Sequence, residues 1–170
     1  KTALRDAVRR LGEYDLQVGA ARVSVKRVRP CDWSESWKRH FKPMEFGRAL
    51  LVKPTWSRRA PKPGQQVVLL DPGLSFGTGQ HATTRFCLEQ LVLNRDPARP
   101  QSFCDMGTGS GILAIAAAKL GYSPVRCFDF DRDCVRIARE NAALNQVYRV
   151  VKPSFGDVTR LPPQPTSQND

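Results

Sequence analysis

The 170-residue sequence lacks an apolar run long enough to span a membrane, which would need roughly 18 residues. Its N-terminus has no apolar signal segment and no initiator Met. We therefore expect the chain to begin inside a longer gene product that makes no membrane contact. No stretch of sequence repeats, which argues against a solenoid or a repeat array.

Histidine and cysteine are also scarce. The sequence contains two histidines and five cysteines, and no two cysteines have the spacing of a zinc site. An odd number of cysteines argues against a disulfide framework and favours the reducing conditions of the cytoplasm. We therefore predict a cytoplasmic protein that binds no metal.

Acidic residues are rare in the first part of the chain. Residues 1–62 hold 16 basic and 6 acidic residues, a net charge of +10, whereas residues 63–170 hold 11 and 10, a net charge of +1. A basic N-terminal portion beside a near-neutral remainder predicts contact with RNA or with another acidic surface. The alternative, a solvated surface rich in arginine, remains open at this point.

The N-terminal residues predict small pieces of structure without a core. Apolar residues at helical spacing predict a helix over residues 2–14, ended near Gly12. Alternating valines predict a strand over residues 21–29. We interpret residues 1–30 as the remnant of an α+β domain.

Residues 31–62 are predicted to form a linker helix and a strand that leads into the main domain. Trp33, Trp37 and Phe41 fall on one stripe of a short helix within residues 31–47, which ends in a turn. We expect this stripe to pack the linker against the main domain. Two short β-rich runs predict strands at residues 49–52 and 67–70.

The main domain, residues 63–170, shows a regular alternation of strand and helix patterns. Such alternation predicts an α/β fold with a parallel sheet covered by helices, of which this chain holds the first three strands. Pro153 interrupts the third strand, which is therefore expected to be irregular or at an edge. Helices are predicted at residues 83–93, 111–120 and 131–144, and strands at 102–106, 125–130 and 148–155.

A glycine-rich turn separates the first of these strands from its helix. Residues 103–112 read FCDMGTGSGI, with Gly107, Gly109 and Gly111 in the spacing G-x-G-x-G. Glycines permit a tight turn and let a ligand approach the backbone, and the helix N-terminus offers free N–H groups. The dinucleotide pattern G-x-G-x-x-G would require glycine where Ile112 stands, and no phosphate-loop sequence of the NTPase type occurs.

An acidic residue ends the next predicted strand. Asp129 lies 22 residues beyond Gly107, where a carboxylate accepts hydrogen bonds from both ribose hydroxyls of an adenosine. Phe130 beside it is predicted to lie against the adenine. Asp157, after the third strand, is placed where such folds usually bind the adenine amino group.

A second unusual segment precedes the sheet. Residues 71–84 read DPGLSFGTGQHATT, so glycines, one histidine and two threonines lead into a helix. Thr83 and Thr84 can cap this helix or offer hydroxyl groups to a ligand. His81 has no partner histidine at a metal-binding spacing, so we expect it to be structural or to face the cofactor.

These segments carry a family resemblance. The G-x-G-x-G turn, with Asp105 two residues before it, resembles the first motif of class I methyltransferases that use S-adenosylmethionine (SAM). Together with DPGLSFGTGQHATT and FDFD, it resembles the PrmA family of ribosomal protein methyltransferases over roughly residues 31–147. The resemblance implies a partial Rossmann-like methyltransferase fold, SAM as the cofactor, and cofactor contacts at Thr84, Gly107 and Asp129.

The resemblance also implies a substrate. The family methylates lysine side chains and an α-amine of a large-subunit ribosomal protein, which it docks on a small N-terminal domain. This chain departs from the family by having Ala82 in place of proline and by lacking an asparagine-containing motif after a fourth strand, so we interpret it as truncated at both ends. Two alternatives remain: a SAM-dependent enzyme acting on RNA or a small molecule, and an inactive module that retains the fold. No catalytic residue is assigned.

Overall fold

A computed structural model describes residues 2–14, 22, 24, 41–70 and 81–160. The chain divides into two compact units, residues 1–38 and 39–170, and each is considered by itself. The predicted strand over residues 21–29, the tryptophans of the linker stripe and most of the DPGLSFGTGQHATT segment lie outside the described residues.

The described part of the first unit is one helix and a short turn. Helix α1, Thr2–Leu11, is followed by the 3₁₀ helix η1, Gly12–Tyr14. The α-helix therefore ends next to Gly12, as predicted. Leu4 and Leu11 on α1 are exposed. No helix among the described residues is both long enough and apolar enough to cross a membrane.

The second unit begins with a small mixed sheet. It contains β1, Met44–Phe46, β2, Leu50–Lys53, and β3, Gln66–Leu69. Strand β2 pairs antiparallel with β1 and parallel with β3. The two strands predicted in this region are confirmed with a shift of one residue at the start of β2 and of β3. The helix and turn predicted over residues 31–47 are wrong at their described end, because residues 44–46 form β1.

The difference arises from the pairing of β1 with β2, which the turn after β1 permits. Gly47 has a φ angle of 58°, a left-handed conformation that glycine adopts readily, and it turns the chain back so that β1 can pair with β2. Phe41 and Phe46 are buried in the core of this unit. Phe41 and Phe46 are therefore core residues, and their spacing does not indicate a helix over residues 41–46.

A second sheet holds three parallel strands in the order β4-β5-β6. This arrangement, with helices between successive strands, confirms the predicted α/β fold. Asp131 caps α5 by accepting a 2.8 Å hydrogen bond from the backbone N–H of Asp133. The elements are α3, Ala82–Leu93, β4, Phe103–Met106, α4, Ile112–Lys119, β5, Val125–Asp129, α5, Arg132–Leu144, β6, Ser154–Phe155, and η2, Val158–Arg160.

The third strand is much shorter than predicted. Residues 148–153 are not part of a strand, and β6 consists of Ser154 and Phe155 alone. The backbone N–H groups of Val150 and Val151 both donate to the carbonyl of Val147, which closes a turn. Gln146 before it has a φ angle of 60°. The predicted edge position of this strand agrees with the order β4-β5-β6.

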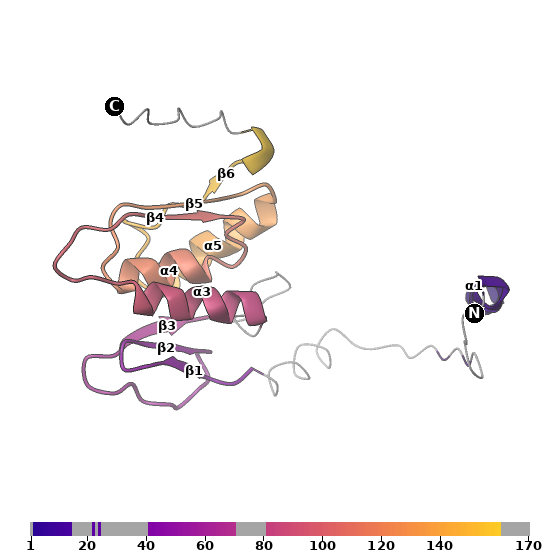
Figure 1. Cartoon of the computed structure of the whole chain (residues 1–170), viewed down its shortest axis with the longest axis horizontal. Helices are drawn as coiled ribbons and strands as arrows, with labels where there is room; N and C mark the ends of the chain where they lie inside the picture. The colour runs from indigo at the N-terminus through magenta and orange to yellow at the C-terminus, as the bar shows by residue number, and fades with distance from the viewer. Residues whose placement is uncertain (1, 15–21, 23, 25–40, 71–80, 161–170) are drawn as a thin grey trace, which may run out of the picture. The chain divides into compact units, whose positions relative to one another are not determined.

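Helices α3, α4 and α5 lie between the two sheets (Figure 1). Helix α4 packs against β3 on one side and against β4 and β5 on the other. Its run of buried alanines, residues 114 and 116–117, keeps the helix thin enough for both contacts. Asn145, at the C-terminus of α5, joins the layers, because its side chain donates to the carbonyl of Leu69 and accepts from the N–H of Leu69.

Candidate cofactor site

The site is built around the loop between β4 and α4. Gly107 and Gly111 have φ angles of 76° and 80°, which L-residues with a side chain rarely adopt. A Cβ atom on Gly111 would lie 3.0 Å from the Cβ of Ala138, so this glycine lets α5 approach the start of α4. A Cβ atom on Gly107 would meet nothing within 4 Å, so this part of the loop faces open space.

Two buried side chains fix the shape of this loop. The amide nitrogen of the Asn141 side chain donates a 2.9 Å hydrogen bond to the carbonyl of Ser110. The Asp105 carboxylate accepts from the Thr108 hydroxyl at 2.7 Å and from the N–H of Ala114 at 3.3 Å, both through the same oxygen. Burial raises the pKa of Asp105, and these two hydrogen bonds partly oppose that rise.

Asp129 connects the loop to the end of the next strand. One carboxylate oxygen accepts a 2.8 Å hydrogen bond from the N–H of Gly109, and the other accepts a 2.9 Å hydrogen bond from the N–H of Asp131. Asp129 is buried. Each carboxylate oxygen has two lone pairs, so both can still accept a hydrogen bond from a ligand hydroxyl.

A hollow of about 220 Å³ lies beside the loop. Four residues predicted for the cofactor site line it: Thr84, Asp105, Gly107 and Gly109. The other four predicted residues, Gly111, Asp129, Phe130 and Asp157, do not line this hollow. Asp129 is nevertheless attached to its wall through the hydrogen bond from Gly109.

The two residues predicted to contact adenine lie after β5 and β6. Phe130 follows Asp129 directly and is 73% exposed, so its ring is accessible to a planar ligand. The Asp157 carboxylate accepts hydrogen bonds from the hydroxyl and the N–H of Thr159, which lower its pKa. The N–H of Gly156 donates to the carbonyl of Asp129, which brings the ends of β5 and β6 together.

Sequence reasoning missed part of the lining. Cys87, Met106, Thr108, Ile112 and Leu113 also face the hollow. Thr83 faces it too, in agreement with the expectation that its hydroxyl group is available to a ligand. Two simple signals point to some of them: Cys87 lies three residues after Thr84 on the same helix, and Thr108 stands between two loop glycines. Which strand and helix residues face the hollow depends on how α3 packs against the loop, and no local pattern encodes that packing.

His81 stands just before α3, where its ring has a structural contact. Its Nδ1 atom lies 2.8 Å from the hydroxyl oxygen of Thr83, within hydrogen-bond distance. This contact is consistent with the expected structural role at the start of the helix.

The arrangement defines a class of protein. A parallel sheet, a glycine loop leading into a helix, and a carboxylate at the end of the adjacent strand form the nucleotide-type site of Rossmann-like α/β proteins. The G-x-G-x-G spacing and Asp105 are the features that resemble class I methyltransferases.

Comparison with known proteins identifies the family. Residues 1–159 match the family model described as "Ribosomal protein L11 methyltransferase (PrmA)", and the chain belongs to this family. Two relatives of that name come from Geobacter sulfurreducens, 49% identical over 140 residues, and Alkaliphilus oremlandii, 40% identical over 155 residues. The matches cover 81% and 91% of this chain but 46% and 49% of the relatives, so the chain spans about half their length.

A solved structure supports the same fold. The crystal structure of ribosomal protein L11 methylase from Lactobacillus delbrueckii subsp. bulgaricus is 36% identical, with a TM-score of 0.59. The match covers 67% of this chain and 57% of that chain. The fold is thus a partial Rossmann-like methyltransferase fold.

Proposed function

We propose that this chain binds SAM and serves in the N-methylation of lysine side chains and an α-amine of a ribosomal protein. The observation that carries the proposal is the buried Asp129 carboxylate, held by Gly109 of the glycine loop at the end of β5. An acid fixed in this place, with lone pairs to spare, suits the two hydroxyls of an adenosine ribose.

The residues present fit the cofactor. Asp129 would hold the ribose, and Phe130 and Asp157 would lie at the adenine. Gly107 would allow the ligand to approach the backbone, because nothing lies within 4 Å of the place its Cβ would occupy. Thr84 and Asp105 line the hollow beside the loop and would contact the remaining part of the molecule.

The chemistry of methyl transfer asks for positioning rather than for a strong acid or base. SAM supplies a methyl group on a sulfonium, which an uncharged amine attacks in line. The described residues would orient the cofactor through the loop, because Asn141 and Asp105 hold the loop and Asp129 joins it to β5. We assign no catalytic base.

The N-terminal portion is proposed to face the substrate. Residues 1–30 would end a substrate-recognition domain, residues 31–62 would link it to the methyltransferase domain, and residues 63–170 would hold the cofactor. We propose that the reaction takes place in the cytoplasm, where a ribosomal protein substrate is expected to be available. We also propose that the basic N-terminal portion contacts RNA or another acidic surface.

A methylation assay tests the proposal. The chain is incubated with radiolabelled SAM and either unmethylated large-subunit ribosomal proteins or ribosomal RNA. We expect label in a ribosomal protein, on lysine or α-amine nitrogen, and none in RNA. Label in RNA alone would favour an RNA methyltransferase. No label in either substrate, although the chain binds S-adenosylhomocysteine, would contradict methyl transfer by this chain.

A further inference from the structure

The small sheet of the second unit carries a concentration of positive charge that the cofactor site does not use. Residues 41–70 contain six basic residues and a single acidic one, Glu45. None of the six lines the hollow beside the glycine loop. We call them the basic surface: Lys42, Arg48, Lys53, Arg58, Arg59 and Lys62.

Part of this surface is held in place by short contacts. Arg59 and Lys62 both pair with Glu45, and their hydrogen bonds, from Lys62 first, lower the pKa of that carboxyl group. Lys53 donates a 2.8 Å hydrogen bond to the carbonyl of Arg59. The single carboxylate of Glu45 pairs with both Arg59 and Lys62. Because one negative charge cannot neutralise two positive charges, the surface keeps a net positive charge.

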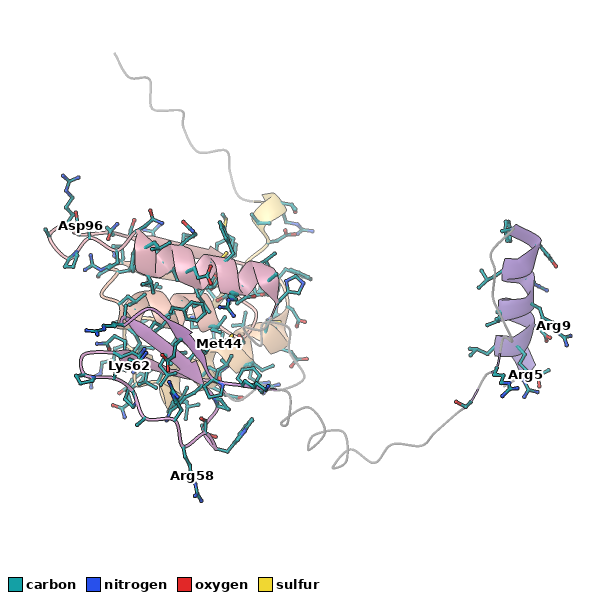
Figure 2. The ribbon with its side chains drawn as sticks, turned by 60° about the horizontal axis from the view of Figure 1, so that its bottom comes forward. Arg5, Arg9, Met44, Arg58, Lys62 and Asp96 are labelled. Atoms are coloured by element: carbon teal, nitrogen blue, oxygen red, sulfur yellow. The ribbon has the colours of Figure 1, made fainter. Side chains whose placement is uncertain are left out.

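Two arginines of the basic surface have no acidic partner among the described residues. Among the ion pairs of the described residues, none involves Arg48 or Arg58. Figure 2 shows Arg58 extending outward from the loop between β2 and β3. Their guanidinium groups therefore remain available to an anion.

A buried glutamine fixes the geometry around Arg48. The Gln65 side chain is 7% exposed, and its amide nitrogen donates to the carbonyls of Gly47 and Leu50, both at 3.4 Å. Its oxygen accepts a 3.0 Å hydrogen bond from the N–H of Lys62. These bonds join the turn before Arg48 to the loop of Lys62, beside a hollow of about 400 Å³ lined by Arg48, Lys62 and Pro63.

We propose that the basic surface binds single-stranded RNA through its phosphate backbone, with a phosphate in the hollow between Arg48 and Lys62. Arginine and lysine clusters are the usual phosphate contacts of RNA-binding proteins. The loop between β2 and β3, which carries Arg58 and Lys62, also carries Trp56, which is 41% exposed. An aromatic ring on an arginine-rich loop provides a stacking surface for RNA bases.

The charge of the basic surface favours RNA over an acidic protein as its ligand. Protein interfaces usually have an apolar centre depleted of charge, whereas the described residues that line the hollow are two cations and a proline. The inference also rests on the proposed function, because a ribosomal protein is a component of an RNA-containing particle. RNA bound at this surface would hold the enzyme near its substrate.

Binding of a short, fluorescently labelled single-stranded RNA of mixed sequence tests the proposal. Anisotropy is measured at several salt concentrations for the chain and for the double variant Arg48→Gln, Arg58→Gln. We expect the variant to bind about tenfold more weakly, with a salt slope smaller by about 0.7 for each cation removed. The control, Arg136→Gln with Arg149→Gln, removes the same charge from α5 and the loop after it, and should change the affinity much less.

Three results would overturn the proposal. The first is an unchanged RNA affinity in the Arg48→Gln, Arg58→Gln variant. The second is a loss of RNA affinity in the control variant as large as the loss in that variant. The third is displacement of the RNA by a polyglutamate peptide that binds the chain as tightly as the RNA does. The measurement uses no cofactor, and both double variants are also titrated with S-adenosylhomocysteine. Failure at the basic surface is therefore distinguished from failure of the proposed methyl transfer.

Discussion

The carboxylate of Asp129 accepts a 2.8 Å hydrogen bond from the backbone N–H of Gly109, 20 residues earlier in the chain. This bond joins the end of β5 to the loop between β4 and α4. The carboxylate is buried, and its second oxygen accepts from the N–H of Asp131. The proposed ribose-binding group is therefore fixed by the same glycine loop that is proposed to receive the cofactor.

Replacing Gly111 with alanine tests the packing behind this loop. A left-handed conformation costs a residue with a side chain about 1–2 kcal/mol. The new Cβ would also lie 3.0 Å from the Cβ and 3.2 Å from the Cα of Ala138, and such overpacking costs roughly a further 1–3 kcal/mol. We expect a lower free energy of unfolding in urea for Gly111→Ala.

Gly64→Ala is the matched control for that variant. Gly64 has a φ angle of 76°, but its Cβ would meet nothing within 4 Å. Gly64→Ala should therefore lose only the free energy that the left-handed conformation costs, without the cost of overpacking. If both variants lose the same stability, α5 does not press against the loop as described.

Asp105→Asn tests the buried carboxylate. The oxygen that accepts from Thr108 and Ala114 can be kept as the amide oxygen, while the charge is removed. Because burial raises the pKa of Asp105, its ionisation opposes folding: the wild-type chain loses stability as pH rises through the folded-state pKa.

We therefore expect Asp105→Asn to be the more stable protein at pH 7, with the difference shrinking in acid. Asp157→Asn should behave oppositely, because the pKa of Asp157 is lowered by its bonds from Thr159. The stability that Asp157 contributes is present above its unfolded-state pKa and is lost as pH falls through the folded-state value. Urea unfolding at a series of pH values measures both, and a wild type more stable than Asp105→Asn at neutral pH would refute the assignment.

Asn145→Ala tests the link between the two sheets. Asn145 is buried, and its side chain satisfies both the N–H and the carbonyl of Leu69. Each buried backbone group left unpaired costs about 1–3 kcal/mol, and two such groups would cost about 2–6 kcal/mol. Because Leu69 is only partly buried, we expect a loss in the lower half of that range, roughly 2–4 kcal/mol, in the free energy of unfolding. Asn94→Ala removes an exposed amide at the end of α3, bonded to the carbonyl of Gln90, and should cost less than about 1 kcal/mol. Equal losses would mean that Asn145 does not support β3.

Local sequence signals were sufficient for much of the fold. The helices α3, α4 and α5 and the strands β4 and β5 begin and end within one residue of their predicted positions. Periodic apolar residues and the glycine-rich turn were enough to locate these elements in the sequence. The same signals placed Asp105 and Asp129 beside the glycine loop.

Other features depend on contacts that no local pattern encodes. Strand β1 was predicted as part of a helix and turn, because the pairing that makes it a strand comes from β2. A strand was predicted over residues 148–155, but the chain turns near residue 150 and only residues 154–155 pair with β5. The roles of Thr108 and Gln65 arise from hydrogen bonds that form only after the loops have folded.

Calorimetric titration with S-adenosylhomocysteine is the most direct test of the account. We expect the chain to bind it, and Asp129→Ala to bind about 2 kcal/mol more weakly, roughly 30-fold, because charge-assisted hydrogen bonds to the ribose are lost. Asp133→Ala, which removes an exposed carboxylate in the first turn of α5, should bind like the wild type, and thermal unfolding should show that both variants are folded. No binding by the wild-type chain, or an affinity unchanged by Asp129→Ala, would contradict a SAM site at this loop.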